Sequence, residues 1–183
     1  MTITLRPARP ADAEEMTRWF ADPASLAEWG GPEARFPLTP DQLAAWIAEG
    51  GNPQPRICFT EVDVHDRPIG HVEFLRDPPR MWARLGRFAV APERRGKGLG
   101  RALFDHAVRF AFTELDVEHL ALAVVDTNER AIRLYVSSGF RDEDVAPDSR
   151  IASGRPYPVN VMGLMRSDWL RLTGAPSGAT RVA

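Results

Sequence analysis

The chain has 183 residues, 44% hydrophobic and 26% charged, with a formal net charge of −2, which is typical of one globular domain and argues against nucleic acid as a partner. Cys58 is the only cysteine, which excludes an intramolecular disulfide and a cysteine-built metal site, and we predict no bound metal. Because the N-terminus is unlike a signal peptide and no run approaches about 20 apolar residues, we expect a cytoplasmic protein without a membrane partner.

The N-terminal residues predict a short strand followed by a helix. Residues 3–6 alternate between apolar and polar side chains, as half-buried strands do. Pro10 or Asp12 then begins a helix whose apolar stripe runs to Phe20, and Pro23 is expected to end it.

A loop and a second helix follow. Residues 28–37 are rich in helix-breaking residues, and Trp29 within them is expected to border an acceptor pocket. Thr39 and Pro40 carry the cap and first-turn signals of a helix that Gly50 ends.

The middle of the chain predicts a sheet with a crossover helix. Residues 56–64, 68–75 and 82–90 form three extended stretches, and the short turns between them indicate antiparallel neighbours. A helix with a buried face is predicted from residue 99 to 115. Residues 119–125 are almost continuously apolar, which predicts a central strand parallel to the strand before the helix.

The last elements are shorter. They are, in chain order, a helix at 128–137, a helix-ending Gly139, a return to the sheet at 140–141, a polar loop at 142–153, a strand at 156–166 and a flexible tail from 173. The acidic residues 142–144 within the polar loop would favour a cationic acceptor if they lie near the site.

The segment from Arg94 to Arg101 is the strongest motif. Its alternating glycines free the backbone for a tight turn, and the helix that follows contributes the positive end of its dipole, so this segment is suited to bind a phosphate. A P-loop needs Ser or Thr after Gly-Lys, but Gly98 follows Lys97, and the glycine spacing of dinucleotide sites also fails. When this segment is considered without the rest of the chain, the alternative interpretation is a flexible basic turn at the start of a helix.

The remaining pattern, Arg95-x-x-Gly98-x-Gly100, resembles the pyrophosphate loop of the GNAT superfamily of N-acetyltransferases. A second string, N-x-x-A-x-x-L-Y-x-x-x-G-F at residues 128–140, resembles another signature of that superfamily and lies in the same order along the chain. Short strings at 5–8, 29–31 and 161–164 are similar to the branch that contains ribosomal-protein N-terminal and aminoglycoside acetyltransferases.

The resemblance implies a fold and a domain. We expect an α+β (mixed α/β) fold, with a central, mostly antiparallel sheet of six or seven strands, one splayed parallel pair and about four flanking helices. The GNAT domain is expected to span residues 1–172 and the flexible tail residues 173–183.

The resemblance also implies acetyl-coenzyme A as the cofactor and assigns residues to it. Backbone N–H groups of the glycine loop and nearby cations would hold the pyrophosphate, the exposed edge of the preceding strand would pair with the pantetheine amides, and an N–H near Val90 would stabilise the oxyanion. Asn128 would contact the pantetheine arm, although it is equally a helix cap. The expected cofactor-binding residues are Phe88, Ala89, Val90, Arg95, Gly96, Lys97, Gly98, Leu99, Gly100, Arg101 and Asn128.

Two catalytic residues are expected. Tyr135 matches the tyrosine that protonates the leaving thiolate in this superfamily, and its alternative is a core aromatic residue. The glutamate of ribosomal-protein acetyltransferases is replaced by Ala123. Glu73 is the remaining candidate for the general base, and strand alternation places it on the same face as His71. Its alternative is an ordinary solvated strand residue. In that case a water relay, an already neutral amine or Asp126 would take the place of the base.

We therefore predict an enzyme that transfers acetyl from acetyl-CoA directly to a primary amine in a ternary complex. The acceptor would be a protein N-terminus, a polyamine, an aminoglycoside or another small amine. The alternative is a catalytically silent module that binds or senses acyl-CoA. A monomer or homodimer is expected.

Overall fold

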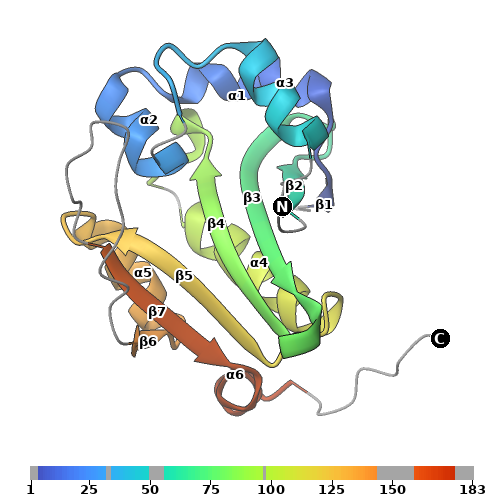
Figure 1. The fold of residues 1–183 in the computed structure, drawn as a ribbon, viewed down its shortest axis with the longest axis vertical. Helices are drawn as coiled ribbons and strands as arrows, with labels where there is room; N and C mark the ends of the chain where they lie inside the picture. The colour runs from blue at the N-terminus through green and yellow to red at the C-terminus, as the bar shows by residue number, and fades with distance from the viewer. Residues whose placement is uncertain (1–3, 32–33, 50–55, 97, 144–158, 176–183) are drawn as a thin grey trace.

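The computed structural model describes residues 4–31, 34–49, 56–96, 98–143 and 159–175, and a single twisted sheet runs through it (Figure 1). The strand order is β1-β2-β3-β4-β5-β7-β6, and only β4 and β5 are parallel. The strands are β1 (Thr4–Pro7), β2 (Arg56–Val62), β3 (Pro68–Asp77), β4 (Trp82–Val90), β5 (His119–Val125), β6 (Arg141–Glu143) and β7 (Val159–Met165).

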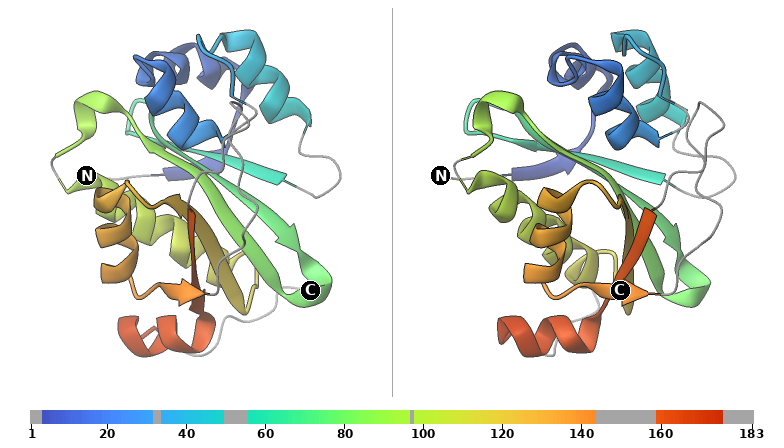
Figure 2. Two further views of the ribbon diagram at one scale, coloured as in Figure 1. Left: turned by 60° about the vertical axis from the view of Figure 1, so that its left-hand side comes forward. Right: turned by 90° about the vertical axis from the view of Figure 1, so that its left-hand side faces the viewer.

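The helices that precede β7 in the chain fall into two groups. Those before β2 lie beyond the ends of β3 and β4, whereas α4 and α5 cover one face of the sheet (Figures 1 and 2). The α-helices are α1 (Ala13–Met16), α2 (Pro23–Gly30), α3 (Pro40–Glu49), α4 (Leu99–Thr113), α5 (Glu129–Ser137) and α6 (Arg166–Thr173). This arrangement confirms the predicted mixed fold, with its mostly antiparallel sheet and its single parallel pair.

The main core lies between the sheet and α4. Leu120 and Leu122 of β5 share this core with Phe104 and Phe112 of α4, and Ala121 between the two leucines is also buried, as the almost continuous apolar run predicted. A second core joins the N-terminal helices to the end of β4 through Ala89. None of the helices in the described ranges combines the length and the apolar character needed to cross a bilayer.

The described residues form six α-helices where the sequence predicted about four, and the two additional helices are α2 and α6. Pro23 begins α2 instead of ending the preceding helix, because Asp22 caps the new helix by accepting a hydrogen bond of 2.9 Å from the backbone N–H of Ser25. Trp29 consequently lies on a helix and not in a loop. At the other end of the chain β7 stops at Met165, and α6 follows where no helix was predicted.

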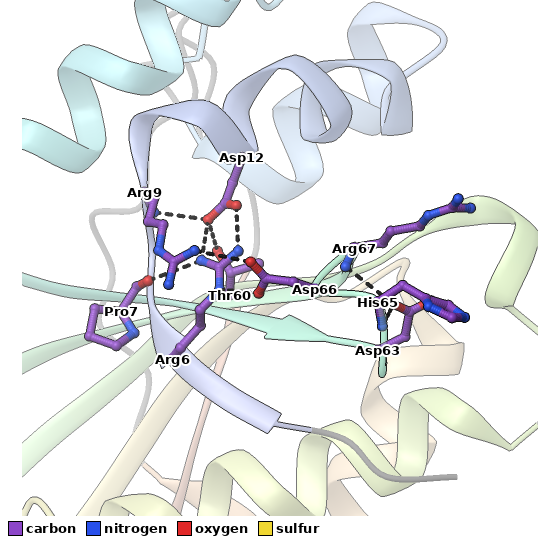
Figure 3. Close-up of polar contacts among 9 residues, drawn as sticks. All are labelled: Arg6, Pro7, Arg9, Asp12, Thr60, Asp63, His65, Asp66 and Arg67. Carbon is purple, nitrogen blue, oxygen red and sulfur yellow. Dashed lines mark hydrogen bonds and ion pairs between the residues drawn. The ribbon is translucent and has the colours of Figure 1, made fainter.

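A buried ion pair anchors the N-terminal segment to the sheet. The carboxylate of Asp12 accepts two hydrogen bonds of 2.8 Å from Arg6 and one each from the Arg9 backbone and the Thr60 hydroxyl (Figure 3). Burial alone would raise the pKa of Asp12, but these hydrogen bonds, with that from Arg6 the largest, lower it. The chain is thereby fixed against β2 at the point where it enters the helices.

Candidate active site

A cavity of about 630 Å³ lies where β4 and β5 separate. The two strands pair from Trp82 opposite His119 to Leu85 opposite Leu122, although both strands continue beyond that point. The described residues supply no strand partner for the β5-facing edge of β4 after Leu85. The predicted splayed pair is therefore present, and its gap is lined by both strands, α2, α5 and the glycine loop.

A bulge in β4 accompanies the separation. The register with β3 shifts between His71, opposite Ala89, and Glu73, opposite Gly86. Arg87 lies in this bulge with a φ of 47°, a left-handed conformation that costs a side-chain-bearing residue about 1–2 kcal/mol. The predicted strand-edge residues Phe88, Ala89 and Val90 line the cavity directly after it.

The glycine loop forms one end of the cavity. Gly96 and Gly98 have φ values of 78° and 76°, and a Cβ atom on either would meet no neighbouring atom within 4 Å. Gly98 caps α4 without a side chain, and among the described residues no side chain accepts a hydrogen bond from the first N–H groups of that helix. Gly96, Gly98 and Gly100 line the cavity, Leu99 does not, and Lys97 lies outside the described residues. This open nest at a helix N-terminus fits a phosphate of CoA.

Four arginines border the cavity near this loop. The predicted Arg101 pairs with Asp105 at 2.7 Å. Arg95 donates to the Val90 carbonyl at 2.9 Å, and its pKa is lowered by burial and then by the positive charge of Arg130. Two guanidinium groups that repel each other in this way favour a bound anion between them. Arg130 and Arg133 were not predicted as site residues, although both lie within the Asn128–Phe140 signature.

The helix α5 brings two predicted residues to the cavity. The Asn128 side chain accepts a hydrogen bond of 3.1 Å from the Ala131 backbone, so this residue is the cap of α5 and also lines the cavity. Tyr135 lines the cavity with its ring packed 4.9 Å from that of Phe104. Burial raises the pKa of Tyr135 to about 12, so its phenol keeps the proton that a general acid must donate.

Glu73 lies behind the wall of the cavity and does not line it. Its carboxylate is 3% exposed, 2.8 Å from Arg87 and 3.4 Å from Arg56, and 3.4 Å from Nε2 of His71. His71 lies on the same face, as predicted, but both side chains are buried and not solvated. Asp126 is exposed and does not line the cavity either.

The helix α2 forms another part of the cavity lining. Ser25, Glu28 and Trp29 project from it, so Trp29 borders the pocket although it lies on a helix. Glu28 supplies the only carboxylate among the described lining residues, and Ala123 occupies the wall where relatives were expected to carry a glutamate. Sequence reasoning assigned this stretch to a loop and selected Trp29 from it as a pocket residue, but gave Glu28 no role. The acidic residues 142 and 143 belong to β6, not to the predicted polar loop, and neither lines the cavity; residues 144–158 lie outside the described residues.

Comparison with known proteins identifies this arrangement. Residues 13–140 match the acetyltransferase (GNAT) family. The chain belongs to this family. The membership confirms the fold and cofactor predicted from the two motifs, and it supports an acetyl-CoA-dependent N-acetyltransferase as the class of enzyme.

Individual relatives of this GNAT protein acetylate different amines. It is 33% identical over 112 residues to the spermidine N(1)-acetyltransferase of Vibrio cholerae, a match that covers 61% of this chain and 65% of that relative. It is 27% identical over 161 residues to the peptidyl-lysine N-acetyltransferase YjaB of Escherichia coli, covering 87% and 95% of the two chains. The crystal structure of the Vibrio cholerae spermidine N-acetyltransferase with CoA and spermine is 25% identical, with a TM-score of 0.76 over 92% of this chain and 98% of that one.

Proposed function

We propose that this protein transfers an acetyl group from acetyl-CoA directly to the primary amine of a small cationic molecule in the cytoplasm. The polarity of the cavity carries the proposal. The glycine loop and the arginines Arg95 and Arg130 line the part expected to hold the phosphates, and Glu28 on α2 is the only carboxylate among the described lining residues. Arg87, which also lines the cavity and contacts the Gly30 carbonyl of α2, is paired with Glu73 at 2.8 Å. Relatives named for spermidine and for peptidyl-lysine also act on primary amines, which supports the choice of acceptor class.

The cavity residues would have the following roles in acetyl transfer. Bound acetyl-CoA supplies the thioester that carries the acetyl group. The loop from Gly96 to Gly100 holds the phosphates, and the free edge of β4 at Phe88–Val90 holds the amides of the pantetheine arm. A backbone N–H near Val90 stabilises charge on the carbonyl oxygen. Tyr135 donates its proton to the departing sulfur.

The amine end of the reaction depends on α2. Glu28 attracts the ammonium form of the acceptor, and water takes the proton that must leave before the nitrogen can attack. As the C–N bond forms and the C–S bond breaks, the second nitrogen proton replaces the one that Tyr135 gives to the sulfur. Direct transfer agrees with the state of Cys58. Burial, and then the nearby Glu73 charge, raise the pKa of this thiol to about 12, so it provides no thiolate to carry the acetyl group.

An acceptor panel tests this function. Free thiol released from acetyl-CoA is measured with spermidine, an aminoglycoside and a peptide with a free N-terminus, in wild type and in Glu28→Gln. We expect release with at least one small cationic amine and a higher KM for it in the variant, with an unchanged KM for acetyl-CoA. Release with the peptide alone, or an unchanged amine KM in Glu28→Gln, would refute the proposed acceptor class.

A second candidate function is a silent acyl-CoA binding module. It is favoured by Ala123 in the wall and by the ion-paired state of Glu73, which together leave the cavity without a carboxylate close to the position expected for a base. A higher melting temperature with CoA, combined with no thiol release for any amine, would establish it. Turnover that falls in Tyr135→Phe would exclude it.

A further inference from the structure

Arg87 connects the bulge of β4 to α2, which lines the cavity, and to α3. Its backbone carbonyl accepts a hydrogen bond of 2.7 Å from the indole N–H of Trp29 on α2. Its guanidinium lies 3.5 Å from the centroid of the Trp46 ring on α3 and donates to the carbonyl of Gly30 at 3.4 Å. One residue therefore contacts α2, α3 and the strand edge expected to bind the acetyl donor.

The same guanidinium is held from the sheet side by Glu73. The Arg87–Glu73 distance is 2.8 Å, and the carboxylate also faces Arg56 of β2 and His71 of β3. Both members of the pair are buried, with exposed side-chain fractions of 10% and 3%. A buried pair of this kind fixes geometry strongly, because removing Arg87 leaves the Glu73 carboxylate with the more distant Arg56, at 3.4 Å.

The left-handed backbone of Arg87 needs such support. A strained conformation persists only where the surroundings determine it, and here the Glu73 ion pair, the Trp46 ring and the Trp29 hydrogen bond all act on the strained residue. The bulge in turn lies where β4 leaves β5 and the cavity opens. The pair is thus placed to set the distance between α2 and the β4 edge.

We propose that Glu73 and Arg87 are positioning residues for acetyl transfer, and that Glu73 acts through Arg87 and takes no proton from the substrate. The pair aligns the acceptor wall, formed by Ser25, Glu28 and Trp29, with the strand edge that holds the donor. This inference rests on the proposed function. It replaces the predicted role of Glu73 as the general base with a role in geometry.

The pH dependence of kcat/KM separates the two roles. In Glu73→Gln we expect kcat/KM for the amine to fall roughly 10- to 100-fold, as small misalignments do, with the shape of the pH profile unchanged. CoA affinity, measured by calorimetry, is expected to stay within about threefold of wild type. Loss of the acidic limb of the profile would instead show that Glu73 is the base and would overturn the proposal.

Two further variants and a control keep the test decisive. Arg87→Gly removes the side chain while glycine accepts the left-handed backbone, and Arg56 still faces Glu73, so the variant is expected to fold and to lower kcat/KM for the amine as Glu73→Gln does. Because the pair acts as a unit, the double variant should be no worse than the more impaired single variant. Additive losses would overturn the coupling. Glu61→Gln, which changes another buried carboxylate on the neighbouring strand β2, is the matched control and should retain the wild-type kcat/KM.

Failure of the proposed Glu73–Arg87 role can be distinguished from failure of the proposed function. Wild-type thiol release with the amine panel tests that function by itself. The coupling between Glu73 and Arg87 is also measured by a double-mutant cycle of thermal unfolding, which needs no turnover. Additive destabilisation in that cycle would refute the coupled pair even in an active enzyme.

Discussion

The indole Nε1 of Trp29 donates a hydrogen bond of 2.7 Å to the backbone carbonyl of Arg87, 58 positions later in the chain. The bond joins α2 to the bulge of β4, the two parts of the cavity that would hold the acceptor and the donor. In the same cluster the Trp29 ring packs 4.6 Å from that of Phe20.

Replacing Trp29 by Phe removes this donor and keeps an aromatic ring. Because the buried hydrogen bond from Trp29 to the Arg87 carbonyl is lost, we expect a loss of about 1–3 kcal/mol in the free energy of unfolding. We also expect a several-fold rise in the KM for the amine. Trp169→Phe is the control, because Trp169 is buried on α6 against Phe112, away from the cavity. Equal effects of the two variants on the amine KM would contradict the role of Trp29.

Gly98→Ala tests the glycine loop. Both Gly98 and Gly174 have left-handed backbones, with φ of 76° and 65°, and neither has an atom near its missing Cβ. Alanine at either position therefore costs about 1–2 kcal/mol of backbone strain. Only Gly98→Ala is expected to weaken CoA binding in calorimetry, by about tenfold or more. Equal CoA affinities in the two variants would show that the loop does not hold the cofactor.

Arg130→Ala is expected to weaken CoA binding without lowering the stability of the free protein. The Arg95–Arg130 repulsion, which lowers the pKa of Arg95, is relieved in the variant. The lost charge–phosphate contact should raise the Kd for CoA about tenfold. Arg18→Ala, on the surface and paired with Glu15, is the control. A lower melting temperature with an unchanged Kd would contradict a phosphate contact.

The buried Glu61 predicts a specific pH dependence of stability. Burial raises its pKa from 4.5 to about 7, and the Nδ1 atom of His106 on α4, 3.6 Å away, compensates only in part. Since the folded state holds the proton more tightly than the unfolded state, stability from this group is greatest below pH 4.5. It falls as the pH rises towards 7, by about 3 kcal/mol.

Glu61→Gln should remove this dependence. We expect urea unfolding to give similar free energies for variant and wild type at pH 5, and a more stable variant at pH 8. A variant that is less stable than wild type at pH 8 would show that the charged Glu61–His106 pair stabilises the fold.

Sequence periodicity was sufficient for the sheet, the crossover helix α4 and the order of the two motifs, because each depends on local patterns. Periodicity gave the wrong role for Pro23, because proline is common both after the end of a helix and in its first turn. The hydrogen bond from Ser25 to the Asp22 cap shows that Pro23 begins α2. Periodicity did not indicate the burial and the ion pairs of Glu73, because the partners Arg56 and Arg87 are distant in sequence and are brought together only by strand pairing and the bulge. Tyr135 and Asn128 could be placed because they belong to a local signature.

The central claim is direct acetyl transfer with Tyr135 as the acid, and the most direct measurement is amine-dependent thiol release by wild type and Tyr135→Phe. With the best amine of the panel, we expect wild-type release to saturate in both substrates. We expect kcat to fall roughly 100-fold or more in the variant while the Kd for CoA is retained. An equal kcat in both proteins, or no release by a wild-type protein that binds CoA, would contradict the account.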